Sequence, residues 1–281
     1  MKDLAVLIPS YNDTAALRRT LDSIEEENYS FTVFVVDDGS REAVVIPPGS
    51  YPFAVEVIRQ TPNGGIVKAL NLGLEHILAR RFNCVARLDA ADLNRRNRFS
   101  IQYRHLDQHP ELAMVGSNVV FRSEKNGEPL FTTNLPLAPE ETRRWIVFRN
   151  SFIHPAVMLR TAVLNDTGLY DASYPHIEDY VLFSRIVKNH RAANLHDPLV
   201  DCFVREGGIS RSNQQKQLFS GLRFKLRHPR PLDPLWYAFL AKRTSFLILP
   251  HSFRDRLKRI LGFTKPAPQR ANANIPVSNQ I

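Results

Sequence analysis

Two carboxylates follow a short apolar stretch in the first half of the chain. Residues 82–88 read Phe-Asn-Cys-Val-Ala-Arg-Leu, and Asp89 and Asp92 come at or just after the carboxyl end of this run. Such a run is typical of a strand buried on both faces of an α/β sheet. Ligands bind at that edge of an open α/β sheet, and a pair of carboxylates suits a hard divalent cation. The alternative is that Asp92 caps the helix expected next, since Asp is a favoured N-cap residue.

A second acidic pair comes where another predicted strand ends. The apolar run 31–36 leads directly into Asp37-Asp38-Gly39-Ser40. Like charges side by side need a hydrogen-bond donor or a cation nearby. Asp38 is therefore a candidate to accept hydrogen bonds from a uracil N–H or from hydroxyl groups, and Tyr11, at the end of a neighbouring strand, offers a face for stacking. The alternative is an ordinary Asp-Gly turn.

A glycine pair precedes the next predicted helix. Asn63-Gly64-Gly65 comes just before it, and Lys68 follows within its first turn. Free backbone N–H groups at a helix N-terminus attract phosphate, and a lysine adds a point charge. The same glycine pair is equally compatible with a simple turn.

Two further acids open a later helix. Glu178 and Asp179 are followed by the apolar residues Val181, Leu182 and Ile186 at helical spacing. Acids in a first turn are favoured by the helix dipole, which is sufficient reason for their presence. The functional interpretation is that Asp179 is a general base kept ionised by that field, and positioned bases contribute roughly 10²–10⁴-fold in rate.

These residues would be positioned by strands and helices that alternate along the chain. Short apolar runs predict strands, apolar residues at helical spacing predict helices, and their alternation predicts an α/β fold with a mostly parallel, doubly wound sheet. Asn126-Gly127 predicts a hairpin turn. The expected strands cover residues 4–8, 31–36, 53–58, 82–88, 112–121, 129–131 and 156–159, and the expected helices include 66–78 and 139–148 and one that begins near 178.

Composition places the chain among ordinary globular proteins. It has 281 residues, of which 43% are hydrophobic and 23% charged, enough for one large domain or two modest ones. Its two cysteines, Cys84 and Cys202, each lie in an apolar run, which favours buried thiols in a reducing compartment. The five apolar residues before Pro9 are too few for a signal-peptide core, and no apolar run is long enough to span a membrane.

Positive charge is concentrated in the last quarter of the chain. Residues 205–281 carry 15 Lys and Arg against three acids, whereas residues 1–204 are slightly acidic. Within 235–262, Trp236, Phe239 and residues 246–248 alternate with cations, which predicts binding to an anionic membrane surface. The alternative is that these apolar residues pack onto the body of the protein. A nucleic-acid partner is not expected, because the chain contains no recognisable nucleic-acid-binding module.

Together and in order, these motifs resemble family 2 glycosyltransferases over about residues 3–210. The resemblance implies a GT-A fold, a nucleotide-diphospho-sugar donor such as a UDP-sugar, a Mg²⁺ or Mn²⁺ ion, and inversion at the anomeric carbon. The motifs are Val6-Leu7-Ile8-Pro9-Ser10-Tyr11-Asn12, Val35-Val36-Asp37-Asp38-Gly39-Ser40, Asn63-Gly64-Gly65 with Ala69-Leu70-Asn71, Arg87-Leu88-Asp89-Ala90-Ala91-Asp92, His154-Pro155 and Glu178-Asp179-Tyr180.

The resemblance also implies roles for single residues. Asp179 would be the catalytic base, and Asp89 and Asp92 would be the metal ligands. The residues expected to bind the nucleotide-sugar are Pro9, Tyr11, Asp38, Asn63, Lys68 and Asp89. Two positions depart from the family pattern: Ala91 replaces a middle acid of the metal motif, and Arg205 stands where a late motif has His.

The resemblance gives an expected domain plan and function. Residues 1–210 would form the catalytic domain, with a nucleotide-sugar part (1–110) and an acceptor part (111–210), followed by a basic amphipathic helical extension (211–263) and a disordered tail (264–281). The expected acceptor is a glycan or a lipid-linked sugar of a bacterial surface polysaccharide, at the inner face of the cytoplasmic membrane. The alternative function is a catalytically weak nucleotide-sugar-binding protein of the same fold.

Overall fold

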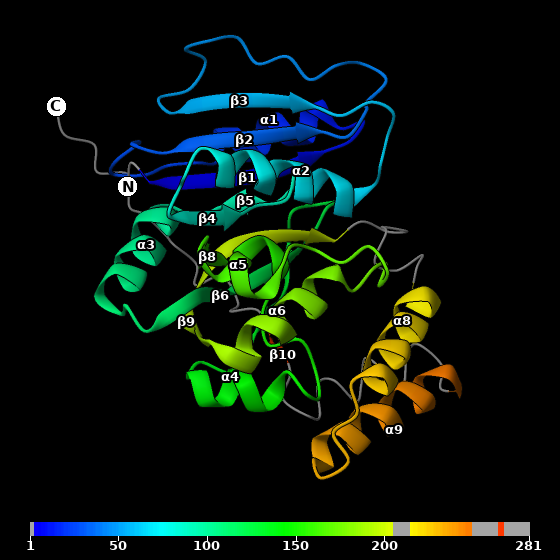
Figure 1. The fold of residues 1–281 in the computed structure, drawn as a ribbon. Helices are drawn as coiled ribbons and strands as arrows, with labels where there is room; N and C mark the ends of the chain where they lie inside the picture. The colour runs from blue at the N-terminus through cyan, green and yellow to red at the C-terminus, as the bar shows by residue number, and fades with distance from the viewer. Residues whose placement is uncertain (1–2, 205–213, 249–263, 267–281) are drawn as a thin grey trace, which may run out of the picture.

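The computed structural model describes residues 3–204, 214–248 and 264–266, which form a sheet covered by helices (Figure 1). The order along the sheet is β10-β7-β6-β8-β4-β1-β2-β3, with β9 paired to β6 and to β5. The strands are β1 (Leu4–Ser10), β2 (Thr32–Asp37), β3 (Ala54–Arg59), β4 (Cys84–Arg87), β5 (Leu93–Asn94), β6 (Leu112–Ser123), β7 (Pro129–Thr133), β8 (Met158–Arg160), β9 (Arg191–Val204) and β10 (Thr264–Pro266).

The N-terminal half of the sheet is parallel, as the sequence predicts. β1 pairs in parallel with both β2 and β4, and β2 pairs in parallel with β3. Leu7 is opposite Arg87 and Ser10 is opposite Asp37, so the carboxyl ends of β1, β2 and β4 meet at one edge. The segments that follow these strands carry Tyr11, Asp38 and Asp89.

The second half of the sheet is mixed. β6 is antiparallel to β7 and β8 but parallel to the long strand β9, which the sequence analysis does not predict. Strand β9 contains Pro198, and the register of its pairing with β6 shifts near that residue, which hides its strand pattern from periodicity. The predicted hairpin at Asn126-Gly127 is present, with Gly127 at a φ of 70°.

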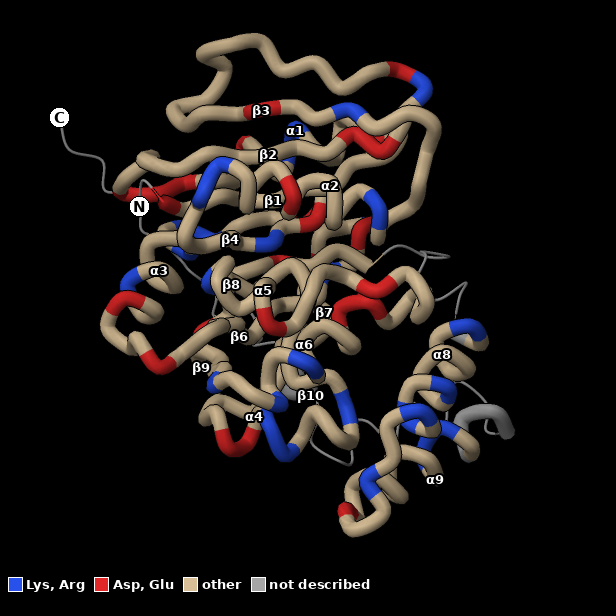
Figure 2. Tube along the Cα trace, in the orientation of Figure 1, with Lys and Arg blue, Asp and Glu red and all other residues tan. Residues whose placement is uncertain are grey.

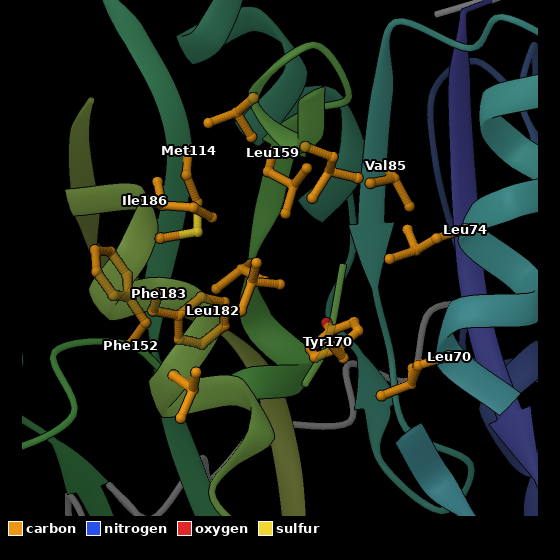
Figure 3. Packing of buried hydrophobic residues seen from close by; sticks show 14 of the residues in the cluster. Leu70, Leu74, Val85, Met114, Phe152, Leu159, Tyr170, Leu182, Phe183 and Ile186 are labelled. Atoms are coloured by element: carbon orange, nitrogen blue, oxygen red, sulfur yellow. The ribbon is translucent and has the colours of Figure 1, made fainter. Parts of the chain in front are cut away.

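Helices cover both faces of the sheet and enclose two apolar clusters. One cluster joins Leu70 and Leu74 of α2 to Phe183 and Ile186 of α6 through sheet residues such as Val85 (Figure 3). The other cluster includes Leu17 of α1 and Phe99 of α3. The helices of this part are α1 (Thr14–Asp22), α2 (Ile66–Ala79), α3 (Arg98–Gln108), α4 (Pro139–Trp145), α5 (Val163–Thr167) and α6 (Glu178–Asn189), with a 3-10 turn at His154–Ala156.

The basic C-terminal segment forms two helices, α8 (Gln214–Arg227) and α9 (Pro234–Ile248), that pack beside α6 (Figure 1). Phe224 of α8 lies edge-on to Tyr180 with ring centroids 5.7 Å apart, and Phe239 of α9 stacks on the same ring at 6.4 Å. Trp236 and Phe239 are buried. The prediction that these two side chains reach a membrane is therefore wrong, because they pack within the protein instead.

Two other expectations concern the disordered tail and the absence of a membrane-spanning segment, and the structure tests each of them only for the described residues. Residues 264–266 were expected to begin a disordered tail but form β10, which pairs antiparallel with β7, while 249–263 and 267–281 lie outside the described residues. Among the residues that are described, no helix combines the length and the apolar character needed to cross a membrane.

Glu26 joins the loop after α1 to the start of α3. Its buried carboxylate accepts hydrogen bonds from the backbone N–H groups of Phe99 at 2.7 Å and Ser100 at 3.0 Å, and from the Ser100 hydroxyl at 2.7 Å. The N-cap residue Asn97 makes no side-chain capping bond. Glu26 therefore satisfies helix N–H groups that would otherwise be without acceptors.

We expect Glu26→Ala to lower the free energy of unfolding by about 2–3 kcal/mol, because it strands buried donors. The measurement is urea denaturation followed by circular dichroism. The matched control is Glu27→Ala, an exposed neighbour that accepts one hydrogen bond from Asn97 and should change stability by less than about 0.5 kcal/mol. Equal effects of the two variants would contradict this role for Glu26.

Candidate active site

The Asp38 carboxylate organises the loop that precedes α2. Oδ1 accepts from the Gln60 amide at 2.6 Å and the Gly64 N–H at 2.8 Å, while Oδ2 accepts from the Asn63 amide and the Gly65 N–H, both at 2.9 Å. Both carboxylate oxygens are thus engaged by the loop. Asp38 therefore holds the shape of the loop between residues 60 and 65.

The same bonds change the expected role of the glycine pair. The N–H groups of Gly64 and Gly65, which the sequence analysis assigns to phosphate, donate to Asp38 instead. Asn63 and Lys68 are exposed, and Lys68 lies in the first turn of α2. The ammonium group of Lys68 can still attract a phosphate, as the sequence predicts.

Tyr11 lies just beyond the end of β1 and is 52% exposed, so its side chain is accessible to a ligand. The backbone around it is held by neighbours: the N–H of Asn12 donates to the Ser40 hydroxyl at 2.9 Å, and the Asn12 side chain accepts from the N–H of Arg41. Pro9 is the penultimate residue of β1 and is buried. The loops after β1 and β2 are thereby tied together beside the exposed ring.

Arg87 is a charged residue of the site to which the sequence analysis gives no role. It is buried at the end of β4 and forms an ion pair with Asp89, and it also donates to the carbonyl oxygens of Leu7 and Leu88. A buried arginine needs such partners to offset desolvation. The ion pair fixes Asp89 at the sheet edge while leaving it partly exposed.

Asp92 turns away from solvent and bonds to a distant strand. It is buried and accepts from the N–H of Phe203 on β9 at 3.0 Å. Helix α3 begins only at Arg98, with Asn97 at its N-cap, so the alternative that Asp92 caps this helix is wrong. Burial, and then the charge of Asp89, raises the pKa of Asp92 to about 8.

These two acids fit a cation that is shared with a ligand. No cluster of three or more Asp, Glu, His or Cys suited to a metal occurs in the described part of the chain. Mg²⁺, however, is commonly held by one or two carboxylates together with substrate phosphates. Ala91, which lies between the pair with φ at 94°, contributes no ligand atom from its side chain. The donor set therefore suits a cation that arrives with a diphosphate.

Asp179 lies in the first turn of α6. Its Oδ2 accepts from the Asn150 side chain at 2.9 Å. Burial raises the pKa of Asp179 to about 7, and the charges of Glu178 and Asp89 add to the rise. A carboxyl group with a pKa near 7 is suited to proton transfer at neutral pH. The charge of Asp89 contributes to this shift although the two acids are 90 positions apart in the sequence.

His154 and Tyr170 are hydrogen-bonded to each other. Nε2 of His154 lies 2.8 Å from the hydroxyl oxygen of Tyr170, which is buried. Burial and the nearby Arg87 lower the pKa of His154 to about 3, so this ring is neutral at physiological pH. Asn71 of α2 exchanges two hydrogen bonds with the backbone of Tyr170. Sequence reasoning assigned no role to Tyr170 or Asn150, because neither follows a strand end or a glycine motif.

Comparison with known proteins identifies the family. The profile of "Glycosyl transferase family 2" matches residues 5–168. A curated relative, "Amylovoran biosynthesis glycosyltransferase AmsE" of Erwinia amylovora, is 31% identical over 210 residues, which cover 72% of this chain and 76% of the relative. This chain belongs to glycosyl transferase family 2. It is a glycosyltransferase, as its motifs predict.

Solved structures of such enzymes share the fold. "Crystal structure of S. aureus TarS 1-349 in complex with UDP-GlcNAc" has a TM-score of 0.62 at 19% identity and covers 86% of this chain and 73% of its own. "Mannosyltransferase PcManGT from Pyrobaculum calidifontis in complex with GDP-Man and Mn2+" has a TM-score of 0.60 at 17% identity and covers 84% of this chain and 68% of its own. The fold of this family 2 glycosyltransferase is therefore GT-A, with the mostly parallel sheet that the sequence predicts.

We expect Asp38→Asn to disrupt the loop at residues 60–65. The new amide group would face two hydrogen-bond donors on one side, which strands at least two of them and lowers the free energy of unfolding by about 1–3 kcal/mol. Urea denaturation and the rate of proteolysis within the loop measure the effect. Glu42→Gln is the control, because it removes an exposed acid a few residues away. A native rate of loop proteolysis in Asp38→Asn would contradict the assignment.

Proposed function

We propose that this glycosyltransferase moves a sugar, with inversion, from a nucleotide-diphospho-sugar to an acceptor hydroxyl. The observation that carries the proposal is the Asp179 carboxyl group in the first turn of α6, which accepts a hydrogen bond from Asn150 at 2.9 Å and whose pKa burial raises to about 7. A carboxyl group held in this way is suited to act as the base. We infer a UDP-sugar as donor, since a related fold is described with UDP-GlcNAc, although another is described with GDP-Man.

In the proposed reaction, Asp179 takes the proton of the acceptor hydroxyl as its oxygen forms a bond to the anomeric carbon. The bond from that carbon to the diphosphate breaks on the opposite face, which inverts the configuration. Asn150 holds one oxygen of Asp179 and so orients the base. Tyr11 stacks on the nucleoside base, Asp38 shapes the loop beside it through the bonds described above, and Lys68 approaches the diphosphate.

A divalent cation, Mg²⁺ or Mn²⁺, completes the proposal. Asp89 and Asp92 are the residues that would hold it, together with the donor diphosphate. When bound, the cation supplies positive charge that stabilises the leaving diphosphate. Arg87 orients Asp89 at the edge of the sheet through their ion pair.

The acceptor is proposed to be a glycan or a lipid-linked sugar in bacterial surface polysaccharide synthesis. The relative whose name refers to amylovoran biosynthesis supports this class of product. A lipid-linked acceptor would be met at the inner face of the cytoplasmic membrane, where we place the enzyme as a peripheral protein.

The second candidate function is a catalytically weak protein that binds nucleotide-sugars. Ala91 at the middle position of the metal motif, and the engagement of Asp92 by Phe203, favour this alternative. A panel of radiolabelled nucleotide-sugars separates the two functions. Hydrolysis or transfer of one donor supports the transferase, whereas tight binding without turnover of any donor supports the binding protein.

We expect Asp179→Asn to lower turnover by roughly 10²-fold or more, because the amide cannot accept the proton. Donor affinity, measured by titration calorimetry, should stay near the native value. In the native enzyme, kcat/KM should rise with pH and level off above about 7, because the pKa of Asp179 is raised to about 7 and only its ionised form is a base.

The control for this prediction is Asp166→Asn, an exposed acid on α5 that should leave turnover unchanged. Native turnover in Asp179→Asn would rule out the base. A pH profile of the native enzyme that stays flat from pH 5 to 9 would equally contradict the assignment.

We expect removal of divalent ions by EDTA to abolish turnover, and Mn²⁺ to restore it, because the diphosphate needs a counter-charge that Asp89 and Asp92 position. Paramagnetic resonance of Mn²⁺ in the presence of UDP tests the site without catalysis. Ala91→Asp should tighten Mn²⁺ binding by restoring a third carboxylate. Full turnover after thorough chelation would show that the enzyme works without a metal.

A further inference from the structure

One side of α8 faces away from the body of the protein and presents apolar and cationic side chains together. Phe219 is 60% exposed and Leu226 is 64% exposed. They are seven residues apart, or two helical turns, and so lie on the same side of the helix. Lys216 and Arg223 occupy the same side at spacings of three and four residues and are also exposed. The result is a stripe in which cations alternate with apolar groups.

The opposite side of α8 holds the helix in place. Leu218 and Phe224 are buried, and the Phe224 ring packs against Tyr174 at 5.3 Å and Tyr180 at 5.7 Å. The orientation of α8 is therefore fixed by its inner contacts. The outward stripe contributes little to this packing, so its composition requires another explanation.

The turn after α8 and the start of α9 also expose large apolar side chains. Leu232 is 97% exposed, and Tyr237, whose hydroxyl donates to the Pro231 carbonyl, is 52% exposed. Large exposed hydrophobic side chains of the described residues number nine, and four of them lie between 219 and 237. Such a concentration of exposed apolar side chains is typical of an interaction surface.

Charge points to the kind of partner. The chain has no Asp or Glu from Gly207 to Leu232, whereas Lys216, Arg223, Arg227 and Arg230 are all exposed. Figure 2 shows blue segments along α8 and no red ones. A surface that combines cations with isolated large apolar groups complements an anionic lipid bilayer, in which apolar side chains enter the headgroup boundary and cations meet the headgroups.

We propose that the α8 face, defined as Lys216, Phe219, Arg223, Leu226 and Arg227, binds an anionic lipid surface. This residue set differs from the one that the sequence suggests, because Trp236 and Phe239 are buried. The contact does not depend on the transfer chemistry. On its inner side, α8 contacts α6 through Phe224, which packs on Tyr180, the residue that follows Asp179.

The test is sedimentation of the full chain with vesicles of equal parts phosphatidylglycerol and phosphatidylcholine, or of phosphatidylcholine alone. The native chain should bind only the anionic vesicles, and less at high salt. The double variant Arg223→Glu with Arg227→Glu should weaken binding more than 100-fold, at roughly fivefold for each unit of charge changed. Phe219→Ser with Leu226→Ser should weaken it at least tenfold with the charge unchanged.

Matched controls separate this face from net charge and from general apolar exposure. Arg96→Glu with Arg104→Glu changes the charge equally at exposed sites elsewhere, and Ile101→Ser with Leu130→Ser removes other exposed apolar groups. Both controls should bind like the native chain. Thermal melting confirms that each variant is folded.

Several outcomes would overturn the proposal. These are no binding by the native chain, equal binding to neutral vesicles, or equal losses in the α8 pairs and their controls. Sedimentation velocity provides a further check without lipid. A native dimer that Phe219→Ser with Leu226→Ser converts to a monomer would show that a second copy, rather than a bilayer, covers the face.

Discussion

The fully buried guanidinium group of Arg98 is the interaction on which the geometry of the site depends. It donates to the carbonyl oxygen of Arg87 at 2.7 Å and to the Gln102 side chain at 3.0 Å, and Gln102 in turn donates to the Ala156 carbonyl at 2.9 Å. A buried charge that loses its partners is strongly destabilising. Helix α3, the end of β4 and the 3-10 turn are therefore held together. Asp89 comes two residues after the end of β4.

The candidate active site combines a buried arginine with three acidic residues, Asp89, Asp92 and Asp179. Arg87 balances Asp89, whereas Asp92 and Asp179 have raised pKa values because they are buried beside other carboxyl groups. Burial is the main reason that Asp179 is a better proton acceptor near neutral pH. Tyr170, which is buried, and its hydrogen-bonded partner His154 carry no charge at physiological pH.

The C-terminal helices link this site to the outer surface of the protein. Phe224 and Phe239 both pack on Tyr180, the neighbour of Asp179, so α8 and α9 support the helix that carries the proposed base. Lys225 lies over the same rings, and burial lowers its pKa to about 7. Packing against α6 explains the aromatic residues that face inward, and the outward face of α8 remains available for a partner.

Periodicity and motif order were enough to determine the parallel sheet, the strand ends that carry Asp38 and Asp89, and the glycosyltransferase family. Each of these depends on the types and spacing of residues that are near one another in the sequence. Only the tertiary structure decided that Asp38 bonds to its own loop, that Asp92 bonds to β9, and that Trp236 packs inward. Those outcomes depend on segments far apart in the chain, and a local pattern identifies a polar or apolar side chain without specifying which distant partner satisfies it.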